Sequence, residues 1–499
     1  MNQIIEAIAI HANRNPGNVA LHSGARKVTY AAVQKNIWKL ATVFIESDIR
    51  VFGLSMDNGI DWVLIDLAAQ CAGITLVPLP PFFSTGQIEY IFGKANIDAV
   101  ISIDRKVIPD KCTTVIIKEL APGVNLYKCA GNGNVYNLLK HTGKITFTSG
   151  TTGTPKGVCL TNESIARVAN SLLAATQFVD IENHLSLLPL STLLENIAGI
   201  YAPLLKGATC QVPSLNETGL TGSTGFDVIR MLECLERYQP DSVILLPQML
   251  NDMVYAAESG IKIPGSLKFI AVGGGVISPS IIKRARTQKL PVYEGYGLSE
   301  CGSVVALNTP QYDRPGSAGK PLNNIDVSLA DDGEIMVKGN FMQGYLGGHA
   351  INNTEWLATG DIGEIDEDGY LYVTGRKKNI FITSFGRNVS PEWTESELIN
   401  TSAIKQAVVF GEARPVNCAV IVPVSNYMDD QLIEVAIDLA NKNLPDYARV
   451  YYWVKAKESF NLKNSLASTN GHPVREKIYK LYENEINHCY ENLLISGSA

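Results

Sequence analysis

The sequence predicts an α/β fold in two parts, and three observations support this prediction. Short segments rich in β-branched residues alternate with segments of helical periodicity along most of the 499 residues, a pattern typical of helices layered on parallel-rich sheets. The length suits two or three domains. Beyond residues 375–378 the chain holds a compact set of elements of about 120 residues, an ordinary size for a domain. We therefore expect an N-terminal domain over residues 1–375 and a C-terminal domain over residues 376–499.

Each expected element follows from its own pattern. Strands are predicted where short, apolar, β-branched runs are bounded by turn residues, and helices where apolar residues recur on one face. The last predicted helix, for example, has Ile478, Tyr482 and Ile486 on one face. The predicted strands span residues 99–103, 242–246, 269–272, 380–383, 407–410 and 419–424. The predicted helices span residues 163–178, 226–238, 429–442 and 475–494.

The composition argues against several classes of protein. Hydrophobic residues make up 46% of the chain and charged residues 18%, which is ordinary for a globular enzyme and unlike a disordered chain. The formal net charge of −7 provides no basic surface for nucleic acid, so we expect no nucleic-acid partner. None of the nine cysteines belongs to a CxxC pair, which disfavours zinc ribbons and disulfide frameworks and fits a reducing compartment.

The sequence shows no targeting or membrane-spanning segment. The first residues lack the basic and apolar regions of a signal peptide. The most apolar stretch, residues 63–80, contains Asp66, Gln70 and Gly73 and ends in prolines. We expect a buried helix followed by a strand there, rather than an integral membrane segment. The expected location is cytoplasmic.

Residues 145–162, ITFTSGTTGTPKGVCLTN, place hydroxyl side chains, glycines and one lysine in a loop. A Walker A loop needs GxxxxGK[ST], and counting from Gly150 the pattern fails at two positions, so this is no P-loop. Backbone N–H groups freed by the glycines, together with the hydroxyl donors, can instead surround an anion, to which Lys156 adds a positive charge. A solvated turn explains the loop equally well when it is considered alone.

The loop resembles the signature of the ANL superfamily of adenylating enzymes, which includes acyl-CoA synthetases, amino-acid-activating domains and luciferases. Further matches follow in that family's order and cover nearly the whole chain. They are AVGGGVISP at 271–279, YEGYGLSECG at 293–302, LATGDIGEIDEDGYLYVTGRKKN at 357–379 and ITSFGRNVSPEWTESEL at 382–398. The resemblance implies a large N-terminal domain of α/β layers with a β-barrel-like subdomain, and a small, mobile α+β C-terminal domain.

The resemblance also implies a reaction. Members of the family bind ATP and a carboxylic acid, form an acyl-adenylate with release of pyrophosphate, and mostly transfer the acyl group to a thiol. We expect an AMP-forming ligase that activates a fatty acid with ATP and Mg²⁺ and transfers it to CoA. Two alternatives stay open: an acyl-AMP ligase that loads the phosphopantetheine of an acyl carrier protein, and a non-catalytic acyl- or nucleotide-binding homologue.

Carried over residue by residue, the resemblance implies a nucleotide site. The β- and γ-phosphates are expected at Thr148, Ser149, Gly150, Thr151, Thr152, Gly153 and Lys156. Asp361 is expected to bind the ribose, since an ionised acceptor suits two hydroxyl groups, and Arg376 to reach the ribose or a phosphate. Glu300 is the expected Mg²⁺ ligand, because Mg²⁺ prefers oxygen. The remaining expected nucleotide residues are Gly274, Gly275, Glu294, Gly295, Tyr296, Gly297 and Ser299.

The acid site is expected to be apolar. Amino-acid-activating relatives carry an aspartate for the substrate ammonium, and residues 186–205 contain none. This segment resembles the LPL…E segment of medium- and long-chain acyl-CoA synthetases, with Glu195 at the matching glutamate. Gly273 and residues 244–250 are expected beside the acyl chain. Packing within a helix core explains the same leucines equally well.

Two departures from the family bear on catalysis. The family's C-terminal motif has a lysine that stabilises charge during adenylation, and His472 stands at that position in LASTNGHPVREKIY. A protonated His472 could do the lysine's work, Lys463 or Arg475 could replace it, or adenylation could be slow. The second departure is Phe385 in TSFGRN, at the point where a glycine of acyl-CoA synthetases lines the pantetheine tunnel. Phe385 would narrow that tunnel and weaken the case for CoA, whereas a one-residue shift of the alignment places Gly386 there instead.

The resemblance assigns one further residue. Lys378, two positions after Arg376, matches the hinge about which the C-terminal domain rotates between the two half-reactions. Such domain closures take microseconds to milliseconds. We therefore group Lys378 with His472, Lys156 and Glu300 as the expected catalytic residues.

Overall fold

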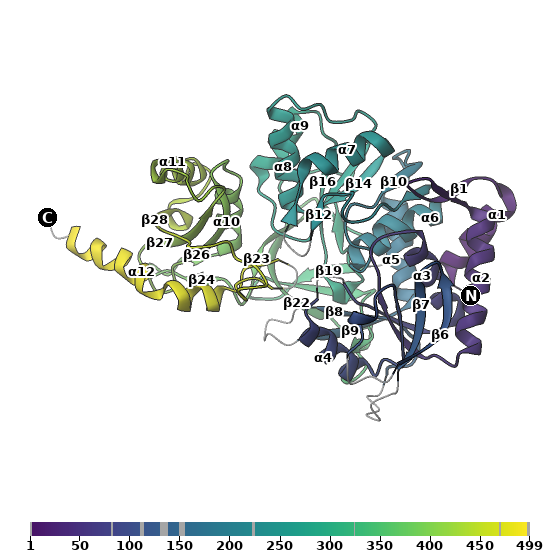
Figure 1. Cartoon of the computed structure of the whole chain (residues 1–499). Coiled ribbons are helices and arrows are strands. Elements are labelled where there is room, and N and C mark those ends of the chain that lie inside the picture. The colour runs from purple at the N-terminus through teal and green to yellow at the C-terminus, as the bar shows by residue number, and fades with distance from the viewer. Residues whose placement is uncertain are drawn as a thin grey trace.

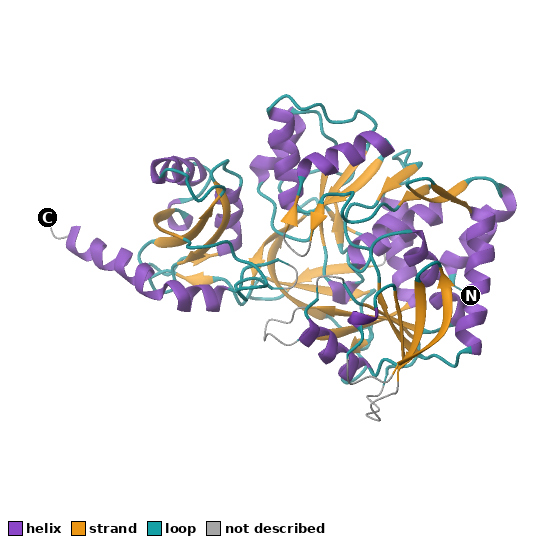
Figure 2. Ribbon diagram, viewed as in Figure 1, coloured by secondary structure: helices purple, strands orange, loops and turns teal. Residues whose placement is uncertain are grey.

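The computed structural model describes residues 2–80, 83–109, 114–129, 138–148, 155–221, 225–323, 325–468 and 471–496. Figure 1 shows a large N-terminal part and, at the left of the view, a smaller C-terminal part that ends in helix α12. Figure 2 shows that strands occupy the middle of the large part and that helices cover them. The predicted α/β class is confirmed.

The first large sheet is parallel in its middle and antiparallel at its edges. In the described residues its strand order is β18-β17-β16-β15-β14-β10-β11-β1-β2. The six strands from β16 to β1 pair in parallel, with Val243 opposite Ile270 and Ile270 opposite Val292. The bounds are β18 Lys320–Pro321, β17 Ala306–Leu307, β16 Val292–Tyr296, β15 Phe269–Val272, β14 Ser242–Leu245, β10 Asn183–Leu185, β11 Thr209–Gln211, β1 Val19–Ser23 and β2 Arg26–Thr29.

The second large sheet has the same design. Its order in the described residues is β21-β9-β8-β4-β3-β5-β7-β6, and β8, β4, β3 and β5 pair in parallel. The antiparallel hairpin of β8 and β9 carries the phosphate loop predicted from the sequence. The bounds are β21 Gly344–Tyr345, β9 Lys156–Thr161, β8 Thr142–Thr148, β4 Thr75–Pro78, β3 Val51–Ser55, β5 Ala99–Ser102, β7 Val124–Cys129 and β6 Thr114–Ala121.

Helices cover the two large sheets. The bounds are α1 Gln3–Arg14, α2 Tyr30–Glu46, α3 Ile60–Ala72, α4 Thr85–Ala95, α5 Asn162–Ala175, α6 Ala202–Lys206, α7 Val228–Tyr238, α8 Pro247–Glu258 and α9 Pro279–Thr287, with short turns η1 Arg105–Val107, the π-helix η2 Glu195–Tyr201 and η3 Ser299–Cys301. Side-chain caps fix several starts: Thr161 accepts a hydrogen bond from Ser164 N, and Asp227 accepts from Ile229 N.

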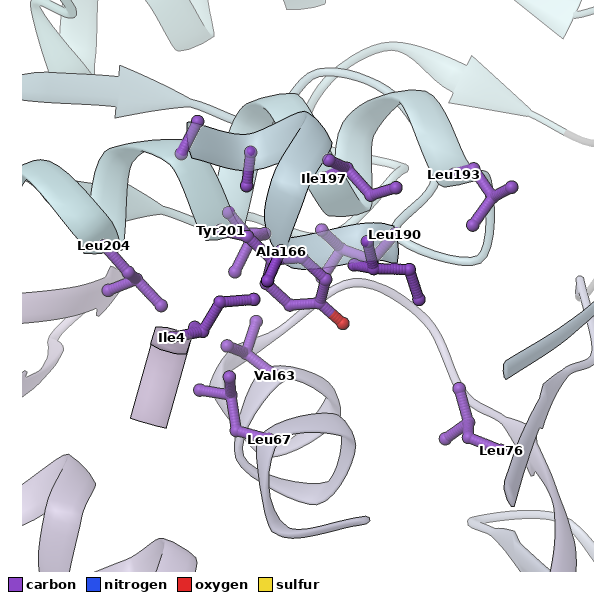
Figure 3. Close-up of a cluster of buried hydrophobic side chains, with 14 of the residues drawn as sticks. Ile4, Val63, Leu67, Leu76, Ala166, Leu190, Leu193, Ile197, Tyr201 and Leu204 are labelled. Atoms are coloured by element: carbon purple, nitrogen blue, oxygen red, sulfur yellow. The ribbon is translucent and has the colours of Figure 1, made fainter. Parts of the chain in front are cut away.

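The core between the two large sheets is built on α3. This helix contacts β1 in one sheet and β4 in the other, which explains why most of its residues are buried. Figure 3 shows Val63 and Leu67 of α3 facing Ile4 of α1 and Tyr201 of η2. Asp66 and Gln70, which argued against a membrane span, lie on this buried helix and bind other polar groups. No helix in the described residues is long and apolar enough to cross a membrane.

A smaller antiparallel sheet leads into the C-terminal part. Its order in the described residues is β19-β20-β22-β23. The family resemblance implied a β-barrel-like subdomain without giving its place in the chain. The bounds of the strands in this sheet are β19 Ile325–Leu329, β20 Glu334–Gly339, β22 Leu357–Ile365 and β23 Leu371–Arg376. A separate two-stranded sheet pairs β12 Leu220–Thr221 with β13 Gly225–Phe226. Strand β23 ends at Arg376, where the C-terminal residues begin.

The C-terminal part has hydrophobic clusters of its own, whose buried members run from Phe381 to Tyr490. The bounds are β24 Phe381–Ile382, β25 Asn388–Val389, α10 Pro391–Ile399, β26 Ile404–Phe410, β27 Asn417–Pro423, α11 Asp430–Asn441, η4 Asp446–Ala448, β28 Val450–Lys455 and α12 Arg475–Ser496. Strands β26, β27 and β28 form one sheet. The boundary between residues 375 and 376 stays a prediction, and separate clusters on its two sides support it.

Candidate nucleotide-binding site

The site lies at the carboxyl ends of β15 and β16. These parallel neighbours place the residues that follow them at one edge of the sheet. Gly273, Gly274 and Gly275 follow β15, and the backbone runs so close that a Cβ on Gly273 would lie 3.2 Å from Gly295 O. Gly297 follows β16, and a Cβ there would overlap the carbonyl of Ser303. A side chain at Gly297 would therefore displace the turn η3, which carries Ser299 and Glu300.

Asp361 lies beside this edge, on β22, and binds two groups at once. Its Oδ1 lies 2.9 Å from Nε of Arg376 on the adjacent strand, and its Oδ2 accepts a hydrogen bond of 2.7 Å from the hydroxyl of Tyr296. Burial raises the pKa of Asp361, while the charge of Arg376 and the Tyr296 hydrogen bond oppose the rise. Residues predicted from two separate motifs, at 293–302 and 357–379, thus form one cluster.

Glu300 and Lys156 meet at Tyr345. The hydroxyl of Tyr345 donates to Oε1 of Glu300 at 2.8 Å, and Nζ of Lys156 lies 5.2 Å from the centre of the Tyr345 ring. Arg376 also acts on this group, because its charge lowers the pKa of Tyr345 against the larger opposite effect of burial. The sequence analysis missed Tyr345, since a Gly-Tyr pair before a loop is too common to single out.

A magnesium ion fits this arrangement. Among the described residues no group of three or more His, Cys, Asp and Glu side chains could hold a metal alone. Mg²⁺ in nucleotide sites is commonly held by one or two carboxylates and the substrate phosphates. The half-buried carboxylate of Glu300 has its Oε2 free of hydrogen bonds and ion pairs within the described residues. One carboxylate beside a lysine therefore suits Mg²⁺ bound to a phosphate chain.

The predicted phosphate loop is described only at its ends. Thr148 is the last residue of β8, Lys156 is the first of β9, and the two residues pair across the hairpin. The five predicted residues between them, Ser149, Gly150, Thr151, Thr152 and Gly153, lie outside the described residues. The exposed ammonium of Lys156 is thereby held on the side of the hairpin that faces Tyr345.

His472 approaches the same edge from the C-terminal part. Its turn is closed by hydrogen bonds between Ser468 N and His472 O at 2.7 Å and between His472 N and Ser468 Oγ at 3.2 Å. The ring is exposed, yet the surrounding protein reduces its hydration. Together with the charge of Arg376 this lowers the pKa of His472, and Glu392 opposes the effect.

Arg475 is poorly placed to replace His472. Its guanidinium binds Glu395 and the carbonyl oxygen of Val409 and lies 3.8 Å from Glu392. These contacts fix the side chain within the C-terminal part. Lys463, the other substitute considered from the sequence, has an exposed side chain. For Arg475 to reach the nucleotide, it would have to break its ion pair with Glu395, which is unfavourable because Glu395 is buried.

Lys378 lies between two anchored residues. Nζ of Lys377 lies 2.6 Å from Asp332, in the turn between β19 and β20, and 2.7 Å from Glu334, the first residue of β20. Asn379 donates to Glu392 on α10, in the C-terminal part. The exposed Lys378 is thus the link between a residue held by one part and a residue held by the other, which supports the hinge prediction.

Three further predicted residues make no contact with Asp361, Glu300 or Tyr345 among the described residues. Glu195 is fully buried in η2, where its carboxylate accepts from Leu188 N at 3.2 Å and lies 3.0 Å from Nε2 of His184. Glu294 accepts from Gly316 N at 2.8 Å, and burial raises its pKa to about 7. Gly386 lies in an exposed turn beside Phe385, which is 76% exposed. Their predicted contacts with ligands stay predictions.

Comparison with known families decides which class this site belongs to. A model described as AMP-binding enzyme matches residues 8–346, and one described as AMP-binding enzyme C-terminal domain matches residues 378–494. The chain belongs to the AMP-binding enzyme family. The sequence-based assignment to adenylating enzymes is confirmed.

The relatives to which this chain is similar in sequence are named as acid–CoA ligases. A 2-succinylbenzoate–CoA ligase of Bacillus licheniformis is 31% identical over 285 residues, 54% of this chain and 56% of the relative. A long-chain-fatty-acid–CoA ligase of Mycobacterium bovis is 25% identical over 424 residues, 71% of this chain and 70% of the relative. The chain spans a little over half the length of the first curated relatives it matches.

Solved structures agree on the fold along nearly the whole chain. An O-succinylbenzoate coenzyme A synthetase from Bacillus subtilis in complex with AMP has a TM-score of 0.74 at 23% identity, covering 94% of this chain and 97% of that one. The anthranilate CoA ligase AuaEII with anthranoyl-AMP has a TM-score of 0.77 at 18% identity, covering 96% of each. At these identities the likeness establishes the fold, including the small C-terminal domain.

Proposed function

We propose that the chain is an AMP-forming acid–CoA ligase that uses Mg-ATP. The observation that carries this proposal is the meeting of a lysine, a carboxylate free to take a metal and a ribose-type carboxylate around Tyr345 and Arg376. These groups come from segments spread along the chain from Lys156 to Arg376. Family membership and the names of the relatives support the same activity.

The residues divide the proposed chemistry among them. A carboxylate oxygen of the acid attacks the α-phosphorus of ATP, the bond to pyrophosphate breaks, and the thiol of CoA then takes the acyl group and releases AMP. Lys156 and the loop before it bind the β- and γ-phosphates, and Asp361 with Arg376 orients the ribose. Glu300 would hold Mg²⁺, which neutralises phosphate charge when bound.

The acid is proposed to have an apolar body. Leu246 follows β14 at the nucleotide edge, where it is exposed, and a Cβ on Gly274 would lie 3.1 Å from its side chain. An apolar group beside the glycine turn suits an apolar acyl chain. A fatty acid remains the first candidate. An aromatic acid is the second, because several relatives bear the name 2-succinylbenzoate–CoA ligase.

CoA is the proposed acceptor, and the phosphopantetheine of an acyl carrier protein is the alternative. The two are separated by one experiment with purified protein, Mg-ATP and a panel of fatty and aromatic acids. Pyrophosphate release identifies the acid, and thioester formation is then measured with CoA and with holo-carrier protein separately. Thioester on CoA alone supports the proposal, whereas thioester on the carrier alone assigns the alternative. ATP binding without pyrophosphate release for any acid would favour a non-catalytic binding protein.

A further inference from the structure

We propose that Tyr345 is a positioning residue that holds Glu300 and Lys156 at the spacing needed for Mg²⁺-dependent ATP binding. This inference rests on the proposed function, since it concerns the same nucleotide site. It assigns a role to a residue that contacts both a predicted phosphate-binding cation and a predicted metal ligand.

The backbone fixes Tyr345 on both sides. Strand β21 pairs with β9 so that Tyr345 lies opposite Val158, and hydrogen bonds of 2.9 Å and 2.8 Å join Gln343 N to Cys159 O and Leu346 N to Gly157 O. Residues directly opposite each other in a sheet point to the same face, so Tyr345 and Val158 do so. Lys156 is two residues before Val158 and therefore points to that face as well. The lysine therefore lies over the ring as a diagonal neighbour.

The preceding glycine makes this close pairing possible. Gly344 has a φ of +150°, and a Cβ there would lie 2.5 Å from the carbonyl oxygen of His349. A side chain at position 344 would push β21 away from the loop that follows it. Met342 N also donates to Glu300 O at 2.6 Å, so the segment before Tyr345 is tied to the turn that carries Glu300.

The hydroxyl of Tyr345 sets the orientation of the Glu300 carboxylate. It donates to Oε1, which leaves Oε2 as the oxygen without a protein partner in the described residues. A phenol is a neutral hydrogen-bond donor with an ordinary pKa of about 10. A neutral donor orients the carboxylate without cancelling the negative charge that a metal requires.

The ring of Tyr345 acts on the other partner. Its π face attracts the ammonium of Lys156 while leaving the N–H donors of this exposed group available to a phosphate. One side chain thereby contacts both groups that would surround the phosphate chain. Removing the hydroxyl alone and removing the whole ring are thus expected to have different consequences.

The test compares Tyr345→Phe, Tyr345→Leu and wild type by calorimetric titration with ATP, without any acid, at a series of Mg²⁺ concentrations. Loss of an outer-shell partner typically lowers metal affinity about 10–100-fold, so Tyr345→Phe should need about tenfold more Mg²⁺ for half-maximal ATP affinity. Its affinity for ATP without Mg²⁺ should stay unchanged. Tyr345→Leu should lose affinity for ATP both with and without Mg²⁺, because the aromatic ring that holds the ammonium of Lys156 is then absent.

Two controls separate positioning from general damage. Tyr372→Phe removes a comparable hydroxyl that donates to Asp366 at 3.2 Å and should match wild type. In a Glu300→Gln background, Tyr345→Phe should have no further effect on the Mg²⁺ requirement. Equal Mg²⁺ dependence in Tyr345→Phe, Tyr372→Phe and wild type would overturn the positioning role alone. Wild-type protein that binds no ATP at any Mg²⁺ concentration would overturn the proposed function as well.

Discussion

Position 472 carries an imidazole where the family resemblance leads us to expect a lysine. The pKa of His472 is lowered by reduced hydration and by Arg376, so the ring is cationic only at pH values below the ordinary value of about 6.5. The charge that the resemblance implies for adenylation is therefore present in acid and lost as the pH rises through the lowered pKa. Phosphate nearby would raise that pKa once ATP is bound.

This predicts an unusual pH profile. The kcat/KM for ATP, which reports groups of the free enzyme, should increase as the pH falls below about 6.5. His472→Lys should remove this increase and raise the rate at pH 8 by about 10²–10³, the typical worth of a donor aimed at transition-state charge. Pyrophosphate release measured from pH 5.5 to 8.5 tests both statements. A flat wild-type profile, with no gain in His472→Lys, would show that another group supplies the charge.

A second residue-scale prediction concerns stability. Nζ of Lys144, which is fully buried, lies 2.9 Å from Oδ1 of Asp66 and 2.8 Å from the hydroxyl of Tyr201. Burial lowers the pKa of Lys144 and Asp66 opposes this effect. Lys144→Met leaves a buried carboxylate with no positive charge beside it, so the free energy of unfolding should fall by about 3–5 kcal/mol.

Urea denaturation measures this loss. Lys457→Met, which removes a surface ion pair with Glu485, is the matched control and should change stability little. The double variant Lys144→Met/Asp66→Leu should recover much of the loss, because replacing a buried ion pair by apolar side chains is often neutral. A single variant as stable as the control would contradict the assignment of a buried charged pair.

At the scale of elements, the turn η3 decides whether Glu300 reaches its position. The close approach of Gly297 to Ser303 O predicts that Gly297→Ala displaces η3, so affinity for Mg-ATP should fall about tenfold or more, as expected for a disturbed metal ligand. Gly93→Ala in α4, where a Cβ would meet no atom within 4 Å, is the control and should bind normally. Equilibrium binding of Mg-ATP checks the pair. Normal binding by Gly297→Ala would show that the turn tolerates a side chain.

The sequence predicted those helices and strands that depend on a local pattern, and it did not predict those that depend on contacts between distant segments. Strand β15 spans the predicted residues 269–272, and residues 63–80 form the predicted buried helix and strand, because each depends on a local pattern. The π-helix η2 and the pairing of β21 with β9 depend on contacts between distant segments. For that reason the burial of Glu195 and the role of Tyr345 had no local signal.

On the scale of the whole molecule, α10 docks against α8 and α9. The hydroxyl of Tyr255 donates to Asn400 O at 2.6 Å, and Ser278 donates to the buried carboxylate of Glu397 at 2.7 Å. These contacts accompany an arrangement in which His472 lies near Arg376. The family resemblance implies a second arrangement for the transfer step of the proposed reaction, and Lys378 is the proposed hinge.

This predicts separable half-reactions. Lys378→Pro should spare pyrophosphate release and suppress thioester formation, because proline restricts the backbone between the anchored residues Lys377 and Asn379. Lys378→Ala, which removes the charge and leaves the backbone free, should retain both activities. Rates of pyrophosphate release and thioester formation are measured for each variant. Equal loss of both rates in Lys378→Pro would count against the hinge.

The most direct test of the proposed function is detection of the acyl-adenylate itself. Wild-type protein and Lys156→Ala are incubated with Mg-ATP and one acid at a time, without CoA, and the products are identified by mass spectrometry. We predict acyl-AMP and pyrophosphate for at least one apolar acid with wild type, and a strongly reduced yield with the variant. Folded wild-type protein that binds ATP but forms no acyl-AMP with any fatty or aromatic acid would contradict the assignment as an AMP-forming ligase.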